Sequence, residues 1–467
     1  MKNQGFNPYL PSWEYIPDGE PHIFGDRVYI FGSHDIAHGW VFCLGDYVCY
    51  SAPITDLSDW KYEGIIYSRL SDPLNKDGKM CLYAPDVTKG PDGKYYLYYV
   101  LDKTSVISVA TSNTPEGKYE FYGYVHYKDG TRLGEKHGDE PQFDPGVLTE
   151  NGNTYLYGGF CSCGDKSRTG AKVTVLDKDM LTIIKNPETI VPSCEYSDSE
   201  KWKEFRGHEY FEAASIRKFN DTYYFIYSSI VMHELCYATS NSPLGEFRYG
   251  GVIVSNCDLH ISSYKQAEMP SAYGANNHGS IEKIGNEFYV FYHRQTNGTW
   301  FSRQGCAEKI QILKNNTIPQ VEITSNGLNG KPLISKGKYS ASIACNLFTD
   351  KPNMYVGENQ PRITTDGRDG DKSPSYIANI TKNTTIGFKY FDIKDVTKFC
   401  ITTRGYGKGI FEVRTKWNGE CFCKIQIDFT NFWTEYSSDI SLPSGKQSIY
   451  LVYKGDGTCS LLNFEFK

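Results

Sequence analysis

Five polar residues recur along the first two thirds of the sequence at a nearly constant spacing. They are Asp18, Asp86, Asp144, Glu212 and His278, and their separations are 68, 58, 68 and 66 residues. Each precedes a glycine-containing or polar turn that leads into an aromatic segment. A single Asp before a strand is usually a turn residue. The shared register instead predicts that four acids and a histidine meet in one space.

Such a cluster of carboxylates is electrostatically costly, because like charges repel strongly when they are partly desolvated. We therefore expect it to serve chemistry. Cleavage of a glycosidic bond needs a protonated carboxyl that gives a proton to the leaving oxygen, and an ionised carboxylate that activates water or attacks the anomeric carbon. A third carboxylate can raise the pKa of the acid and hold its side chain in place.

The aromatic segments that follow the polar residues form an internal repeat. Their central residues are Tyr29, Tyr96, Tyr155, Tyr224 and Tyr289, which are 67, 59, 69 and 65 residues apart. A turn that enters such a run is typical of the second strand of a β-hairpin. Five four-stranded units of this kind, arranged radially, make a five-bladed β-propeller. The starts of its innermost strands converge at one mouth, where the polar residues are expected.

The repeat stops near residue 320, and a second domain is expected after it. Segments such as GIFEVRTKW (409–417) and SIYLVYKG (448–455) alternate apolar and polar residues with the period of a strand. The sequence therefore predicts an all-β protein, with a propeller in residues 1–322 and a β-sandwich in residues 323–467.

Composition restricts the expected partners. The chain of 467 residues has 37 Tyr, 25 Phe and a net charge of −6. Without a block of Lys and Arg, nucleic acid is not an expected partner. Without an apolar stretch near membrane-spanning length or an apolar N-terminal run, we expect no membrane partner and a cytoplasmic location. The sequence gives no indication of oligomeric state.

The 14 cysteines are scattered along the sequence. The close pairs Cys161/Cys163 and Cys421/Cys423 each have one intervening residue, which is strand spacing and differs from zinc-ribbon spacing. We therefore expect reduced, structural thiols.

Three segments surround the carboxylates: DGEPHIFGDRVYIFGS (18–33), FDPGVL (143–148) and FEAASIRKFNDTYYFIYS (211–228). They resemble motifs of glycoside hydrolase family 43, inverting enzymes on a five-bladed propeller that act mainly on xylosides and arabinofuranosides. The resemblance implies Asp18 as general base, Asp144 as the residue that positions and tunes the acid, and Glu212 as general acid. The family's Asp-Pro dipeptide is absent at Asp18, so Glu20, which shares its strand parity, is an alternative base.

Three further segments resemble the same family: YAPD (83–86), NNHGS (276–280) and FSRQGCAEKI (301–310). They imply that Asp86 lines the pocket, that His278 lies at the propeller centre near a calcium ion, and that Arg303 contacts sugar hydroxyls or a carboxylate. With Glu20 these residues form the predicted substrate-binding set. The alternatives are a water-bonded His278 and an Arg303 held in an ion pair between blades. The chemistry requires no cofactor, and calcium would be structural.

The C-terminal region, with segments such as FTNFW (429–433), resembles carbohydrate-binding modules of family 6, and the resemblance implies a β-sandwich of jelly-roll type. This resemblance makes Trp433, Tyr436 and Asn431 candidates for sugar contact, although each also suits a core, turn or interdomain position. We expect a packing domain that narrows the mouth of the site.

The expected function is removal of a terminal pentose, β-D-xylose or α-L-arabinofuranose, from hemicellulose oligosaccharides with inversion. Inversion requires Glu212 and Asp18 to lie about 6.5–9.5 Å apart. The alternatives are a non-catalytic carbohydrate-binding propeller, a fructan-cleaving five-bladed glycosidase and a phosphorylase-like propeller. Similar hydroxyl patterns leave the choice of pentose open, and the FEAAS run favours arabinofuranosides by family resemblance.

Overall fold

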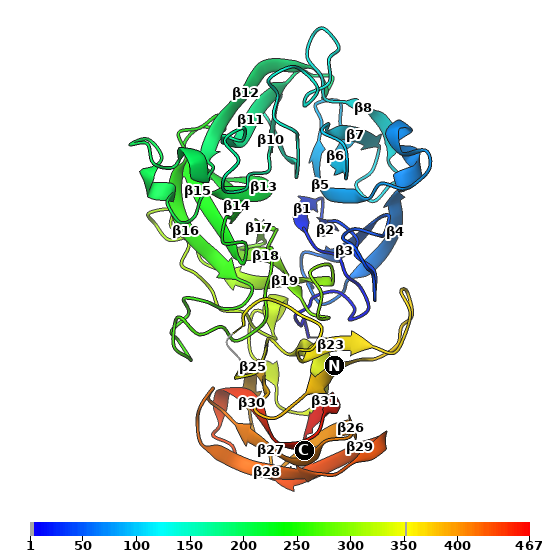
Figure 1. Ribbon diagram of the computed structural model, residues 1–467, viewed down its shortest axis with the longest axis vertical. Coiled ribbons are helices and arrows are strands. Elements are labelled where there is room, and N and C mark those ends of the chain that lie inside the picture. The colour runs from blue at the N-terminus through cyan, green and yellow to red at the C-terminus, as the bar shows by residue number, and fades with distance from the viewer. Residues whose placement is uncertain (1–3, 351–352) are drawn as a thin grey trace.

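The computed structural model describes residues 4–350 and 353–467 and consists of mainly antiparallel β-sheets joined by loops (Figure 1). Helical structure in these residues is limited to 3-10 turns of three residues each. They are Arg69–Ser71, Pro73–Asn75, Cys194–Tyr196, Lys203–Phe205, Gly327–Asn329 and Ala341–Ile343. No helix in the described ranges combines the length and the apolar character that crossing a bilayer requires.

Four consecutive sheets have four strands each, ordered as in the sequence, and a fifth has three. The first sheet contains β1 (Glu20–Phe24), β2 (Arg27–Phe31), β3 (Tyr47–Pro53) and β4 (Lys61–Tyr67). The second contains β5 (Leu82–Lys89), β6 (Tyr95–Leu101), β7 (Ser108–Ser112) and β8 (Glu120–Tyr124). The third contains β9 (Gly146–Glu150), β10 (Asn153–Gly158), β11 (Gly170–Leu176) and β12 (Ile183–Pro192).

The fourth sheet contains β13 (Tyr210–Phe219), β14 (Thr222–Ser229), β15 (Glu234–Ser240) and β16 (Arg248–Ser255), and the fifth contains β17 (Ser280–Ile284), β18 (Glu287–Gln295) and β19 (Arg303–Ile310). The five tyrosines of the repeat all lie in the second strand of their sheet, as predicted. The first strands contact one another in the cyclic order β1, β5, β9, β13, β17 and back to β1. The sheets therefore surround a central space, as Figure 1 shows.

Apolar cores fill the spaces between successive sheets. Separate clusters join the first sheet to the second, the second to the third, the third to the fourth and the fourth to the fifth. A further cluster returns from the fifth sheet to the first, with Ile30 and Phe291 among its buried members. Tyrosine and phenylalanine supply many of the large side chains in these cores, because large rings bury extensive apolar area between sheets. The aromatic composition is explained by this packing.

The fifth sheet has three strands where the sequence predicted four. The N-terminal segment lies beside β19 instead, since the Tyr9 backbone N–H donates to the Gly305 carbonyl at 3.1 Å. The buried Asn7 side chain donates to the Ala307 and Thr324 carbonyls at 2.9 and 3.0 Å. The start of the chain is thereby fixed to the last sheet, which brings β1 next to β17.

After β19 the chain forms two six-stranded sheets. One contains β20 (Leu333–Ile334), β22 (Asn346–Phe348), β25 (Thr385–Ile393), β27 (Lys408–Arg414), β28 (Cys421–Ile427) and β30 (Gly445–Asp456). The other contains β21 (Gly337–Ser340), β23 (Arg362–Thr365), β24 (Ser375–Ile380), β26 (Lys398–Gly405), β29 (Thr430–Asp439) and β31 (Cys459–Phe466). Both sheets contribute to one buried core, which includes Phe388, Phe411, Ile401 and Phe464.

The expectation of reduced thiols is wrong for one pair, because Cys163 and Cys194 form a disulfide. The sequence could not show this, since the partners are separated by 31 residues and meet only through the fold of the third sheet. Disulfides persist mainly in oxidising compartments. The disulfide does not favour a cytoplasmic location, and that location stays a prediction.

Candidate active site

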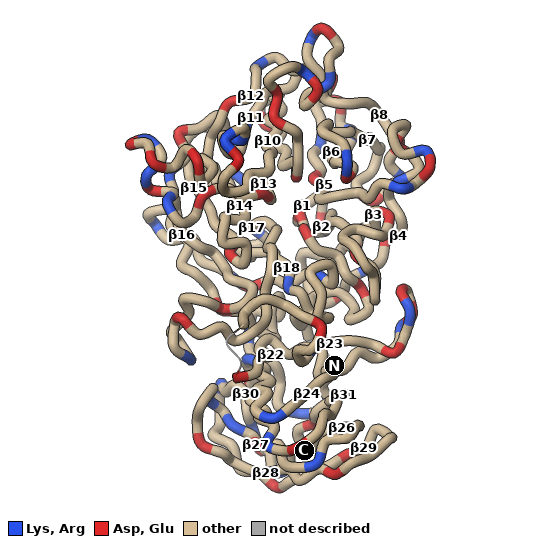
Figure 2. The backbone as a smooth tube through the Cα atoms, viewed as in Figure 1, with Lys and Arg blue, Asp and Glu red and all other residues tan. Residues whose placement is uncertain are grey.

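A cavity of about 260 Å³ opens where the first strands of the five sheets begin. Its polar lining residues are Asp18, Asp144, Glu212, Asn276, His278 and Arg303. Its other lining residues are Phe42, Cys43, Tyr83, Ala84, Phe143, Phe211, Met232 and Trp300. Acidic positions also gather at this centre beside β1, β5 and β13 in Figure 2. The structure thus brings the three predicted catalytic carboxylates into one cavity.

Three residues of the site have backbone angles in the left-handed region. The φ angles are 56° at Asp18, 43° at Asp144 and 69° at Ala213, which follows Glu212. In β13 the pairing with β14 also shifts register between Glu212 and Ser215. Such conformations cost about 1–3 kcal/mol each and persist where surrounding structure fixes them, often at functional sites. Local strain therefore helps to aim these side chains into the cavity.

Asp18 is held as a carboxylate. Burial by itself would raise its pKa, but the charge of Arg303 and the nearby His293 and His278 side chains together lower the pKa well below its usual value. Arg303 Nη1 donates to both carboxylate oxygens, at 2.9 and 3.2 Å. His293 Nδ1 lies 3.3 Å from Asp18 Oδ1. Asp18 therefore remains ionised and available to accept a proton.

Arg303 is fixed by a second aspartate that sequence reasoning missed. Its Nε and Nη2 donate to the two carboxylate oxygens of Asp35 at 2.8 and 3.0 Å. Asp35 is fully buried and also accepts the Cys43 backbone N–H at 2.9 Å. The guanidinium carbon lies 4.8 Å from the centre of the Phe42 ring. This bidentate pair leaves Nη1 directed at Asp18.

Glu212 and Asp144 both have raised pKa values, whereas the pKa of Asp18 is lowered. Burial and then repulsion from Asp18 raise the pKa of Glu212 to about 7, against the effects of Arg303 and Asn276. Burial and then the Glu212 charge also raise the pKa of Asp144. Asp144 Oδ2 accepts the Ala213 backbone N–H at 3.1 Å, which favours its ionised form. The pKa values of both carboxyls are nevertheless raised, and the general-acid role proposed below requires Glu212 to hold the proton.

His278 lies between two of the carboxylates. Its Nδ1 is 3.5 Å from Asp144 Oδ2 and 3.7 Å from Asp18 Oδ1. Burial lowers its pKa to about 4, although the Asp18 charge opposes that change, so the imidazole is neutral. Calcium takes six to eight oxygen ligands, whereas His278 offers nitrogen and the nearby Asp18 is already paired with Arg303. These residues do not form a calcium cage, and no step of the mechanism below involves a metal.

Glu20 and Asp86 do not line the cavity, contrary to the expectation of substrate contact. Glu20 Oε2 accepts from Ser215 Oγ at 3.0 Å and from Arg217 Nη2 at 2.8 Å. Asp86 is fully buried and accepts the backbone N–H of Val147 at 2.7 Å. Both side chains are thus engaged between neighbouring sheets. Glu20 is therefore poorly placed to act as the base.

Apart from Asp35, sequence reasoning missed Asn276, which lines the cavity and whose side chain lowers the pKa of Glu212. It stands two residues before His278, at the start of the NNHGS segment, so its motif carried a signal. Trp300 gave no such signal, since its position on the cavity wall depends on the loop between β18 and β19.

The carboxylate pair in a cavity at the mouth of a ring of antiparallel sheets defines a glycoside hydrolase. The family model for glycosyl hydrolases family 43 matches residues 22–318. The chain therefore belongs to this family. The match begins four residues after Asp18, so the assignment of the base depends on the geometry described above.

The chain is 62% identical over 471 residues to a xylosidase/arabinosidase from Thermoclostridium stercorarium, with 99% of each protein covered. A xylosidase/arabinosidase from Bacteroides ovatus is 27% identical and covers 61% of this chain and 87% of its own length. A solved family 43 arabinoxylan arabinofuranohydrolase from Bacillus subtilis superposes with a TM-score of 0.53 at 21% identity, covering 99% of this chain and 97% of the other. At that identity the superposition supports the fold alone.

Proposed function

We propose that the protein removes single terminal pentoses, β-D-xylose or α-L-arabinofuranose, from hemicellulose oligosaccharides with inversion at the anomeric carbon. The observation that carries this proposal is the electrostatic difference between two carboxylates of one cavity. Asp18 has a lowered pKa and Glu212 a pKa raised to about 7. One base and one acid are therefore ready together at neutral pH. The names of the two relatives support the choice of pentoses.

In the proposed mechanism a terminal sugar enters the cavity. At about 260 Å³ this cavity is smaller than the roughly 300–1,000 Å³ typical of sites for drug-sized ligands, which suits a single sugar unit. Glu212 protonates the leaving oxygen, and Asp18 takes a proton from the water that attacks the opposite face. Arg303 keeps Asp18 ionised, and Asp144 holds the segment that carries Glu212 through the Ala213 N–H.

We also infer that the first five sheets are the blades of a five-bladed propeller. The cyclic contacts of their first strands and the apolar cores between successive sheets support this inference. Radial packing explains why residues about 60–70 positions apart in sequence meet at one mouth.

The pH dependence of kcat/KM tests the assigned protonation states. Activity requires protonated Glu212, so kcat/KM is expected to fall as the pH rises through about 7, the raised pKa of that side chain. The lowered pKa of Asp18 places the acidic limb far below this value. An Asp144→Asn variant removes a negative charge beside Glu212 and is expected to move the alkaline limb to lower pH. An alkaline limb at the same pH in both proteins would contradict the coupling.

The C-terminal unit reaches the mouth of the cavity. The Val356 backbone N–H donates to the Gly274 carbonyl at 3.1 Å. This bond ties the loop between β22 and β23 to the chain before β17. The Tyr355 ring stacks on the cavity residue Trp300 with centroids 6.1 Å apart and planes 13° apart. We propose that Tyr355 and Trp300 contact the sugar on the leaving-group side.

The three residues of the C-terminal unit that the resemblance to binding-module family 6 made candidates for sugar contact lie in three different surroundings. Trp433, a predicted sugar contact, lies 4.3 Å from the Arg404 guanidinium and 5.3 Å from the Tyr376 ring centre. Tyr436 packs partly against the core between the two sheets. Asn431 is exposed and does not line the cavity that holds the three carboxylates. Sugar binding by this unit stays a prediction.

Replacement of Tyr355 by Ala is expected to raise KM for xylotriose several-fold and to change kcat little. Loss of one aromatic stacking contact weakens binding by about 0.5–1.5 kcal/mol. The matched control is Phe432→Ala, because Phe432 is 80% exposed on β29 in the same unit, away from the cavity. Equal KM values for the Tyr355 and Phe432 variants would show that Tyr355 does not contact the substrate.

Hydrolysis of 4-nitrophenyl β-D-xyloside and 4-nitrophenyl α-L-arabinofuranoside tests the proposed activity directly. Turnover of at least one of them is expected from the wild-type chain. Activity on neither pentoside, in a folded protein, would contradict the proposed substrate class.

A further inference from the structure

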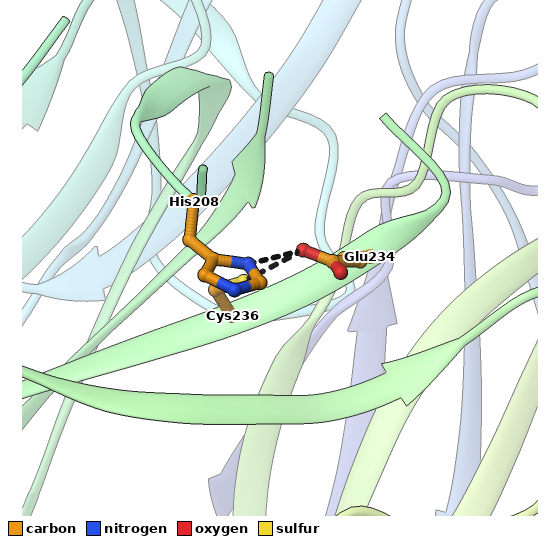
Figure 3. A group of neighbouring side chains, drawn as sticks. All are labelled: His208, Glu234 and Cys236. Carbon is orange, nitrogen blue, oxygen red and sulfur yellow. Dashed lines mark hydrogen bonds and ion pairs between the residues drawn. The ribbon is translucent and has the colours of Figure 1, made fainter. Parts of the chain in front are cut away.

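A second group of ligand-type side chains lies in the fourth sheet, outside the cavity. It consists of His208, in the loop before β13, and of Glu234 and Cys236, which share one face of β15. Figure 3 shows the imidazole and the thiol both directed at the Glu234 carboxylate. His208 Nδ1 lies 2.8 Å and Cys236 Sγ 3.5 Å from Glu234 Oε2. Three different donor types therefore meet at one point.

These separations suit a tetrahedral zinc ion. Zinc bonds of about 2.0–2.1 Å to nitrogen, 2.0–2.2 Å to oxygen and 2.3 Å to sulfur place neighbouring ligand atoms about 3.3–3.6 Å apart. The ligand atoms of the group all lie within 4.8 Å of one another. Shifts of a few tenths of an ångström would convert the hydrogen-bonded arrangement into a coordinated one.

Charge distinguishes this group from two others with similar residue types. In the group of Glu20, His22 and Asp86, a protein cation already occupies the carboxylate, since Arg217 lies 2.8 Å from Glu20. The third group consists of Cys400, Glu435 and Glu465. There Lys467 Nζ lies 3.0 Å from the Glu435 carboxylate and 3.3 Å from the Glu465 carboxylate. Across residues 4–350 and 353–467, the ion-pair partner found for Glu234 is His208. Its charge is not matched by Lys or Arg.

The surroundings of the group orient its ligands. The Tyr249 ring stacks on His208 with centroids 4.9 Å apart and planes 14° apart. Ser229 Oγ donates to Glu234 Oε2 at 2.9 Å. Contacts of this kind fix ligand geometry around metals. The His208 side chain is 31% exposed whereas that of Glu234 is 2% exposed, so an ion and a fourth ligand, water, can approach past the imidazole.

We propose that His208, Glu234 and Cys236 bind one zinc ion. On binding, the Cys236 thiol releases its proton to solvent and the sulfur ligates as thiolate. The Nδ1 proton that His208 shares with Glu234 is also released to solvent or moves to Nε2, and His208 ligates through Nδ1 as a neutral imidazole with its remaining proton on Nε2. The ion ties β15 to the segment that enters β13, four residues before Glu212.

Zinc titration of the full chain with reduced free thiols, followed by isothermal titration calorimetry, tests this site. Wild-type protein is expected to bind zinc at a site that His208→Gln weakens at least about tenfold, because loss of a ligand costs at least as much as outer-shell changes, which cost about 10- to 100-fold. Cobalt gives a second readout, a thiolate-to-metal charge-transfer band that Cys236→Ser should abolish.

The matched control is Cys459→Ser, since Cys459 is a free thiol buried in the C-terminal core and should leave both readouts unchanged. A cobalt-thiolate band absent from wild type, or unchanged zinc affinity in His208→Gln, would overturn the proposal. If Cys236→Ser fails to fold, His208→Gln still decides, because it changes a partly exposed side chain.

Discussion

Replacement of Glu212 by Gln is expected to lower kcat for xylobiose by about 10²- to 10⁴-fold, the usual contribution of a general acid. Gln keeps the shape of the side chain but cannot give a proton to the leaving oxygen. Nitrophenolate departs without protonation, so the loss should be much smaller for 4-nitrophenyl β-D-xyloside. Steady-state kcat on the two substrates measures this difference.

Two outcomes of that comparison would contradict the role of Glu212. Full activity of Glu212→Gln on xylobiose would exclude the side chain from the mechanism. Equal losses on the two substrates would indicate a role that does not depend on the leaving group. An unchanged unfolding temperature of the variant is the control for folding.

Replacement of Asp18 by Asn is expected to lower kcat by about 10²- to 10⁴-fold on both substrates. Water must be activated whatever the leaving group is, so a good leaving group gives no relief. The variant also leaves Arg303 paired with Asp35 alone. The measurement is the same pair of kcat values.

Glu20→Gln is the matched control, because it removes a carboxylate two residues from Asp18 that lies outside the cavity. Its kcat should stay close to the wild-type value. Its unfolding temperature should fall, since Arg217 loses the nearer of its two ionic partners, at 2.8 Å, and keeps Glu282 at 3.4 Å. A large loss of kcat in Glu20→Gln together with an active Asp18→Asn would identify Glu20 as the base.

Much of the fold could be predicted from the aromatic repeat. Burial between sheets imposes the tyrosine period, and each of the five tyrosines lies in the second strand of a sheet. The missing strand of the fifth sheet could not be predicted, because its place beside β19 is taken by a segment about 300 residues earlier, as in the pair Asn7 and Ala307. Pairings of that separation leave no local pattern.

The register of the repeat also predicted part of the active site. Register with the repeat identified Asp18, Asp144 and Glu212, which line the cavity together. The same register also selected Asp86, which the structure engages between sheets, because a strand start alone does not fix where a side chain points. Asp35 was missed, since its role depends on Arg303 from the opposite end of the propeller sequence.

The stereochemistry of the first-formed product tests the central claim, that Glu212 and Asp18 act as acid and base across one sugar. Proton NMR spectra recorded during the first minutes of hydrolysis of a β-D-xyloside distinguish the anomers before mutarotation mixes them. We expect α-D-xylose to appear first, because water attacks the face opposite the leaving group. First appearance of β-D-xylose would show retention and contradict it.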